Sequence, residues 1–245
     1  MKILGIDSSG MVASVALVED GVTKAEYTIN NRKTHSQTLL PMLDEISAML
    51  EDDMSGVDAI AVAAGPGSFT GLRIGGAAVK GLAQAYNKPV IPVPTVQGMA
   101  YNLWGTDSIV CPLMDARRNQ TYTGIYEFVR RDDTFVMNEI LAQCAVPIED
   151  IVEKVNQCDR SVIFLGDGVP VFKEYIDGAC KVPYAYAPAG MNRQRAVSVA
   201  SLGAELFAQG VSRTSTEFAP EYLRLSQAER ERNEQSADNS SDEGR

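Results

Sequence analysis

The sequence predicts an α/β protein of two lobes, each a mixed sheet flanked by helices. Over residues 2–104, apolar runs and amphipathic stretches follow in the order strand, strand, strand, helix, strand, helix, strand, helix. A similar order restarts at residue 108 without a strict sequence repeat, so the duplication is inferred from element order alone. At 245 residues the chain is also long for one core. We expect a first lobe at 1–106, a second at 107–225 and a polar, mostly disordered tail at 226–245.

The first elements are three strands and a helix. Apolar runs at 3–6 and 12–18 flank a turn at 7–11, and a third run follows, which predicts a three-stranded meander. The helix after it has an apolar stripe and a capping pair, formed by Leu39, Leu43, Ile46 and Leu50 and by Thr34 and Gln37. Because Pro41 lacks a backbone N–H, the helix either begins near Ser36 or Thr38, with the proline in its first turn, or bends there.

A glycine-rich turn dominates the rest of the first half. A buried strand is predicted at Val57–Ala64 and a helix at Leu72–Tyr86, and Gly65–Gly76 between them has the sequence GPGSFTGLRIGG. A short strand at 90–93 and a helix at 96–104 complete the lobe.

The second half follows the same plan. Its predicted strands and helices are a strand at 109–114, a turn at 115–119, strands at 121–128 and 135–141, a helix at 148–157, a strand at 162–165 and a helix at 197–209. Residues 233–245 hold almost no large apolar side chain and are expected to be disordered.

Composition narrows the class of protein. With 32 acidic and 22 basic residues the net charge is −10, so the chain repels phosphate backbones and should contact RNA only inside a larger assembly. The apolar run at the start ends at Asp7, too early for a signal sequence, and no later run approaches a membrane span. The four cysteines are widely separated and there is one histidine, which argues against a zinc site. We expect a cytoplasmic protein with reduced thiols and no metal or other cofactor.

The glycine turn does not match a phosphate-binding motif. Counted from Gly65, the sixth position is Thr70, Gly71 comes one place late, and no Lys-Ser or Lys-Thr pair follows. A dinucleotide turn would also need an acid after the next strand, where the chain has Pro94 and Thr95.

Close packing is the alternative for this turn. The helix behind it is poor in side chains, and each glycine inside a helix costs about 1 kcal/mol relative to alanine, so a close neighbour must offset that cost. The preceding helix is apolar over much of its circumference, and the two together predict a partner interface, at Ser36, Leu39, Leu40, Leu43, Ile46, Leu72, Gly75, Gly76 and Val79. The other possibility is that the chain's own sheet and tail cover both helices.

The first turn offers a different function. Asp7 and Ser8 lie between two strands, in a turn that resembles the first phosphate loop of the actin, sugar-kinase and Hsp70 superfamily. The candidate for a second loop is Gly166-Asp167-Gly168, which could equally be an ordinary turn from strand to helix. There is little support for a serine hydrolase. Its catalytic base would have to be His35, the single histidine, and the chain has no G-x-S-x-G segment to supply the nucleophile.

Five segments together resemble the bacterial TsaB (YeaZ) family. They are GIDSS at 5–9, THSQTLLPML at 34–43, GPGSFTGLRIGGAAVKGLA at 65–83, MDARRNQTYTGIYE at 114–127 and PEYLR at 220–224. The resemblance covers almost the whole chain except the tail. It implies an actin-like fold and a role in making N6-threonylcarbamoyladenosine beside the anticodon of tRNAs that read codons beginning with A. It also implies a catalytic paralogue, TsaD, as partner, together with the ATPase TsaE.

The chain departs from the catalytic paralogue at its metal site. Proteins resembling TsaD carry H-x-E-G-H on a helix, whereas the matching region here, residues 34–39, has His35 alone. We therefore expect a non-catalytic subunit that activates the paralogue, forms a homodimer when alone, and meets tRNA only within the complex. A working ATPase or kinase using Asp7, Ser8 and the turn 166–168 is the rival hypothesis, and a His35-dependent peptidase is a third.

Overall fold

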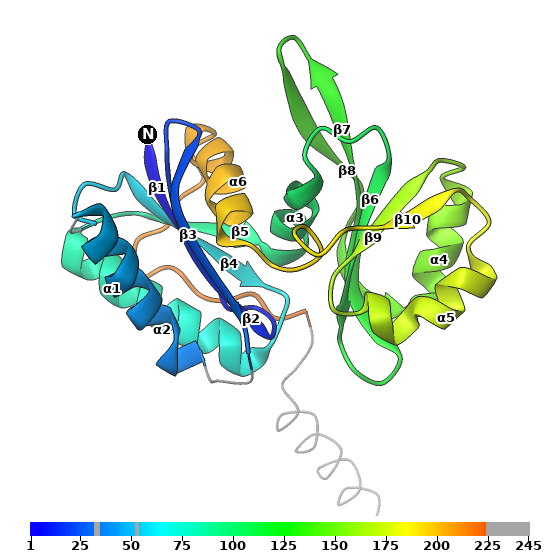
Figure 1. The fold of residues 1–245 in the computed structure, drawn as a ribbon, viewed down its shortest axis with the longest axis horizontal. Helices are drawn as coiled ribbons and strands as arrows, with labels where there is room; N and C mark the ends of the chain where they lie inside the picture. The colour runs from blue at the N-terminus through cyan, green and yellow to red at the C-terminus, as the bar shows by residue number, and fades with distance from the viewer. Residues whose placement is uncertain (32–34, 52–53, 224–245) are drawn as a thin grey trace, which may run out of the picture.

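The computed structural model describes residues 1–31, 35–51 and 54–223. They form two lobes, each built on a five-stranded mixed sheet (Figure 1). The strand order is β3-β2-β1-β4-β5 in the first sheet and, read from the opposite edge, β8-β7-β6-β9-β10 in the second. The two orders are the same, so the duplication and the two-lobed α/β fold inferred from the sequence are confirmed.

The first sheet joins an antiparallel meander to two parallel strands. β1 (Lys2–Asp7), β2 (Val12–Glu19) and β3 (Val22–Asn30) are antiparallel, while β4 (Ala59–Gly65) and β5 (Val90–Pro94) run parallel to β1. Side chains of a strand alternate between the two faces of a sheet, so β1 and β4 supply both of its cores.

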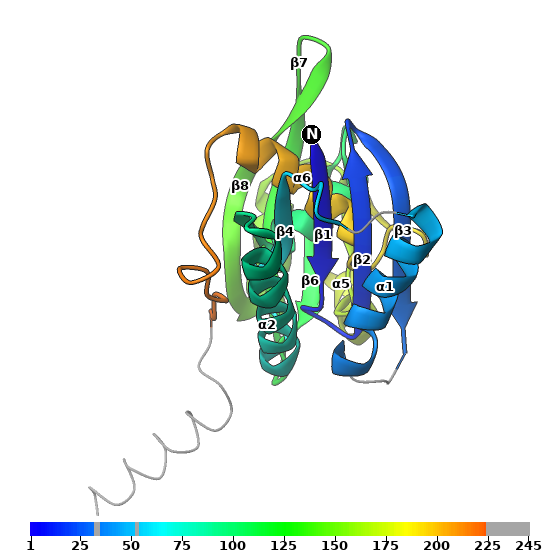
Figure 2. The same cartoon turned by 90° about the vertical axis from the view of Figure 1, so that its left-hand side faces the viewer.

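Two helices cover one face of this sheet, with α1 (Leu39–Leu50) and α2 (Phe69–Tyr86) on the same side (Figure 2). A short 3-10 turn, His35–Gln37, precedes α1, which begins at Leu39 with Pro41 in its first turn. Thr34, the first member of the expected capping pair, lies outside the described residues. α2 begins three residues before the predicted start, because the Ser68 hydroxyl accepts a hydrogen bond from the Gly71 N–H at 3.2 Å.

The second lobe repeats this arrangement. Its sheet contains β6 (Ile109–Asp115), β7 (Gln120–Arg131), β8 (Thr134–Pro147), β9 (Val162–Leu165) and β10 (Tyr184–Tyr186). α4 (Ile148–Gln157) and α5 (Val169–Ala179) pack on it, and the β7–β8 hairpin projects beyond the lobe (Figure 1). Neither α5 nor β10 was predicted from the sequence.

Two further helices lie between the lobes. α3 (Thr95–Ala100) packs on the second sheet, and α6 (Ala196–Ala208) returns from the second half of the chain to cover the other face of the first sheet. The next residues stay on the first lobe, where Arg213 pairs with Val90 and Phe218 enters the core under α1 and α2. Residues 196–223, expected in the second lobe, therefore lie against the first.

No helix within the described part of the chain is both long and apolar enough to span a bilayer.

Candidate functional site

The turn after β1 encloses an aspartate. Asp7 is buried, and its Oδ1 accepts hydrogen bonds from the Ser9 N–H at 2.9 Å and from the Ser9 hydroxyl at 2.7 Å. Burial raises the pKa of Asp7 to about 6, although both Ser9 bonds and the nearby His35 act in the opposite direction. The turn is held by its own hydrogen bonds, and its carboxylate is kept out of water.

Ser8, the residue after Asp7, packs against the side of α2 that carries glycines in place of larger side chains. Ser8 is buried, and its hydroxyl donates to the Gly71 carbonyl at 2.9 Å. A Cβ built on Gly71 or Gly75 would lie within 3.0 Å of Ser8 atoms, closer than real Cβ contacts come. The missing side chains at these two positions therefore make room for the chain's own first turn, and not for a partner helix.

The chain's C-terminal segment occupies the other side of the glycine turn. The Glu221 N–H donates to the Ala64 carbonyl at 2.7 Å, and Gly65, at φ +125°, lies against the Glu221 backbone. Beyond it, the ring of Tyr222 lies 5.1 Å from that of Phe69, and the guanidinium of Arg73 lies over Phe69. The glycine turn, which suggested a ligand site in the sequence, therefore packs against two other segments of the same chain, the first turn and the C-terminal segment.

The single histidine ties the first turn to the start of α1. The Nε2 atom of His35 lies 2.8 Å from the carbonyl oxygen of Gly10. Because a carbonyl only accepts, Nε2 carries the hydrogen, and Nδ1 is buried with no hydrogen-bond partner among the residues that the structure describes. Gln194 also lies against Gly10, and its buried Nε2 has no partner within the described residues. His35 is therefore placed as a structural link in this turn.

The second lobe has an equivalent turn, between β6 and β7. Like Asp7, Asp115 ends the first strand of its sheet, and its Oδ1 accepts from the N–H two residues on, that of Arg117, at 2.8 Å. Its Oδ2 pairs with the Arg117 guanidinium at 3.0 Å. The turn 166–168 was expected to be the counterpart of the first turn. The order of elements assigns that role to residues 115–119, which were expected only to form a turn.

The turn at Gly166-Asp167-Gly168 lies instead between β9 and α5, the position that the glycine turn has in the first lobe. The Gly168 N–H donates to the Leu113 carbonyl at 2.9 Å. Burial raises the pKa of Asp167, whose Oδ1 accepts from the Asp115 N–H at 3.3 Å. No hydrogen bond or salt bridge found between described residues joins this turn to Asp7 or Ser8.

Most residues of the predicted partner interface are buried inside the first lobe. This holds for Leu39, Leu43, Ile46, Leu72, Gly75, Gly76 and Val79, whereas Ser36 and Leu40 are exposed. Other side chains of the two helices are exposed, Leu40 at 53% and Met49 at 70% on α1, and Ala77, Gly81 and Ala85 on α2. We call these five residues the pairing surface. Beside it, a groove of about 490 Å³ is lined partly by Leu40, Asp44 and Tyr86.

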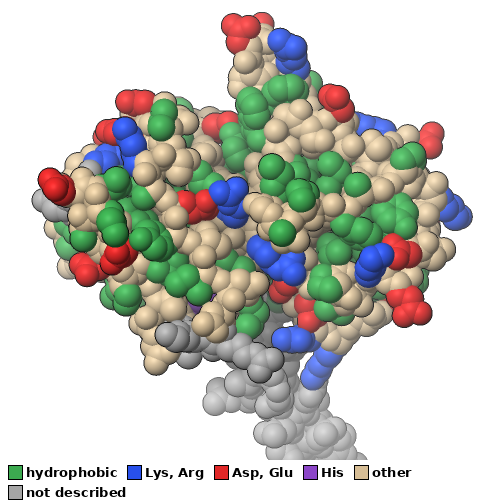
Figure 3. Space-filling view, in the orientation of Figure 1, with side chains coloured by type: hydrophobic (Ala, Val, Ile, Leu, Met, Phe, Trp, Pro, Cys, Tyr) green, Lys and Arg blue, Asp and Glu red, His purple; other side chains and the backbone are tan. Residues whose placement is uncertain are grey.

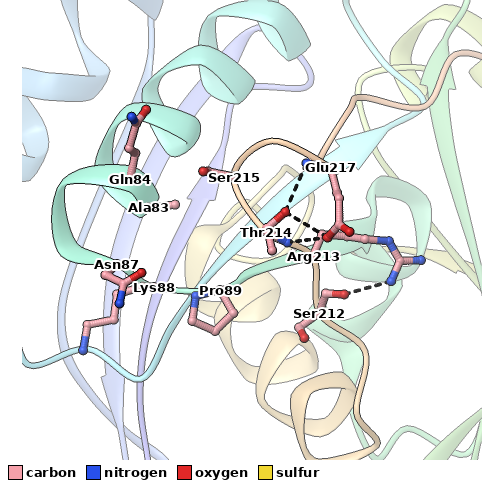
Figure 4. A pocket seen from close by; sticks show the side chains of 10 residues that line it. All are labelled: Ala83, Gln84, Asn87, Lys88, Pro89, Ser212, Arg213, Thr214, Ser215 and Glu217. Atoms are coloured by element: carbon pink, nitrogen blue, oxygen red, sulfur yellow. Dashed lines mark hydrogen bonds between the residues drawn. The ribbon is translucent and has the colours of Figure 1, made fainter.

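A separate polar pocket, of about 430 Å³, lies where the C-terminal segment meets the end of α2 (Figure 4). Glu217 points toward Thr214, whose N–H and hydroxyl donate to the carboxylate at 3.0 and 2.9 Å and lower its pKa. These bonds hold the segment that carries Phe218.

On the face of the molecule in Figure 3, basic and acidic side chains are interspersed on both lobes, as expected for a solvated surface.

Two duplicated mixed sheets, with an aspartate at the end of the first strand of each, define an actin-like two-lobed protein. A family model described as "TsaD: tRNA N6-adenosine threonylcarbamoyltransferase" matches residues 24–232. The tRNA threonylcarbamoyladenosine biosynthesis protein TsaB of Bacillus subtilis is 33% identical over 232 residues, covering 94% of this chain and 96% of its own. The chain belongs to the TsaB (YeaZ) family.

Other relatives agree with this assignment. TsaB of Escherichia coli is 32% identical over 170 residues, which is 69% of this chain and 72% of that protein. The solved structure of YeaZ from Pseudomonas aeruginosa is 27% identical and has a TM-score of 0.75, covering 91% of this chain and 99% of that one.

Proposed function

We propose that this chain is the non-catalytic subunit of a complex that makes N6-threonylcarbamoyladenosine next to the anticodon, in tRNAs that read codons beginning with A. It pairs with a TsaD-like catalytic paralogue and activates it, together with a TsaE-like ATPase. The names of the relatives support the pathway, and the match to a model of the transferase itself supports descent from a common ancestor with the catalytic partner.

The filled turn after β1 carries the non-catalytic part of the proposal. A phosphate-binding turn needs free backbone N–H groups and room for the anion. Here the Ser9 N–H is taken by Asp7, the Ser68 N–H is taken by the Ser9 carbonyl at 2.7 Å, and Ser8 is wedged against α2. In the second lobe, the equivalent carboxylate of Asp115 is already paired with Arg117.

The composition of the chain supports the same role. His35 is its single histidine, and its Nε2 is bonded to Gly10, so it is poorly placed to act as a metal ligand or base. The net charge of −10 disfavours tRNA binding by the chain alone, so we place tRNA contact within the complex.

The pairing surface is the part we assign to the paralogue. The small residues Ala77, Gly81 and Ala85 let a partner helix approach α2 closely, and Leu40 and Met49 are exposed apolar side chains on α1 that can add to the contact. Without the paralogue, the same surface would pair two copies of the chain about a two-fold axis.

Two matched variants test this assignment. A Cβ built on Gly81 or on Gly178 would meet no atom of the described residues within 4 Å, and the two glycines lie on equivalent helices, α2 and α5. Gly81→Arg should abolish both homodimer formation in sedimentation and stimulation of tRNA modification in a reconstituted reaction. Gly178→Arg should leave homodimer formation and direct binding of the paralogue unchanged. Equal homodimer formation and equal binding of the paralogue by the two variants would refute the assignment.

The rival ATPase hypothesis has its own measurement. Calorimetry of the isolated chain with Mg-ATP should show no micromolar binding. Micromolar binding that Asp7→Ala removes would favour the rival and overturn the non-catalytic role.

A further inference from the structure

A groove on the second lobe is lined by residues of α4 and α5. These two helices lie at the end of the molecule opposite α1 and α2 (Figure 1). Two adjoining hollows, of about 670 and 560 Å³, share Glu149, Tyr175, Gly178 and Ala179 in their walls. By the duplication of the fold, α4 and α5 correspond to α1 and α2. The groove is therefore the second lobe's counterpart of the region beside the pairing surface.

One face of α5 presents an uncovered apolar stripe to this groove. Val171, Tyr175 and Gly178 follow one another at helical spacing, and the first two are 57% and 39% exposed. The adjacent face of α5 is used inside the lobe, where Phe172 and Ile176 enter the core, and Phe172 also lines one of the two hollows. A Cβ built on Gly178 would meet no described residue within 4 Å, so the backbone of another helix could approach α5 closely at this point.

The rim of the groove is acidic. Glu149, Asp150 and Glu153 line it from α4 and Glu174 lines it from α5, with Lys181 at one end. No salt bridge between described residues uses any of these four acids. The side-chain hydrogen bonds to Glu149 and Glu153 come from the neutral amides of Asn119 and Gln157. The negative charge around the groove is thus left for an external cation.

We propose that the α4–α5 groove docks a basic amphipathic helix of a partner protein, with the helix's apolar stripe on Val171 and Tyr175 and its lysines or arginines on the acidic rim. An acidic rim repels phosphate, which favours a protein over a nucleic acid here. The chain would then hold two protein partners at opposite ends, one on the pairing surface and one in this groove.

A synthetic probe tests the groove directly. The probe is a fluorescein-labelled helical peptide of about four turns with one leucine stripe flanked by lysines, and the measurement is anisotropy with the full chain at low salt. Gly178→Arg places a long side chain and a positive charge in the groove, and it should weaken binding of the probe by at least about tenfold, or about 1.4 kcal/mol. Glu149→Lys combined with Glu153→Lys should do the same.

The controls separate a built groove from general attraction. Asp132→Lys with Asp133→Lys makes the same charge change at the exposed β7–β8 tip, and Gly81→Arg makes the matched change on α2; both should bind the probe like the original chain. Equal loss in the hairpin-tip variant, undiminished binding by Gly178→Arg, or equal binding of a probe with glutamates for lysines would overturn the proposal. Circular dichroism checks that each variant is folded. Pairing with the paralogue is measured separately, so either proposal can fail alone.

Discussion

The buried Asp7 should make this protein less stable as the pH rises from 4 to 6. Its pKa is raised from 3.8 to about 6 in the folded chain, chiefly because burial disfavours the charged form. Between these two pH values the folded state holds a proton that the unfolded state has lost, so stability falls as pH rises, and the penalty is complete above about pH 6. A shift of about two units corresponds to roughly 3 kcal/mol.

Asp7→Asn removes this penalty and keeps both hydrogen bonds from Ser9, because both go to the oxygen that the amide retains. The difference in unfolding free energy between variant and original should therefore move in favour of the variant by roughly 2.5 kcal/mol between pH 4 and pH 7.5, since part of the penalty is already present at pH 4. Urea unfolding at both pH values measures it, and any pH-independent cost of the amide cancels. Repeating both measurements in chains that also carry His35→Gln removes the electrostatic interaction between Asp7 and the imidazole of His35. A difference that stays constant across this range would refute the reasoning.

Three further experiments test the packing of both lobes. Gly75→Ala should cost about 1–3 kcal/mol in urea unfolding because its Cβ meets Ser8, and Ser8→Gly in the same chain should recover most of that loss; additive losses would contradict this contact. Gly81→Ala and Gly178→Ala should each stabilise the chain by about 0.5–1 kcal/mol, since both glycines are helical with open space around them, and a lower melting temperature would count against it. Phe218→Ala should cost about 3–5 kcal/mol by calorimetry, and a loss below 1 kcal/mol would mean that its segment does not complete the core.

Local patterns predicted most elements well. The bounds of α4 and β9 agree with the expected ones, because each combines a clear apolar pattern with clear flanking residues. α5 was not placed, since Pro170 and Gly178 weaken its helical pattern. The α/β class and the doubled element order needed only these local signals.

The candidate site depended on contacts that no local pattern encodes. The apolar stripe of α1 identified a helix with one buried face, but Leu39, Leu43 and Ile46 proved to be that buried face and not a surface for a partner. The space beside Gly75 is occupied by Ser8, and the space beside Gly65 is occupied by Glu221, which lies more than 150 residues away in the sequence. A run of small residues predicts a close contact, but it does not identify the segment that makes this contact.

The return of α6 to the first sheet sets the order in which this protein can be completed during synthesis. When a ribosome has made only residues 1–106, one face of the first sheet is still bare, because Val199, Ala200 and Leu202 have not been translated. The core under α1 and α2 also lacks Phe218 at that stage. The first lobe to emerge is therefore among the last parts to be finished, and until then its apolar surface is exposed to aggregation or to chaperones. Isolated halves cut at residue 106 should fold poorly apart and better when expressed together.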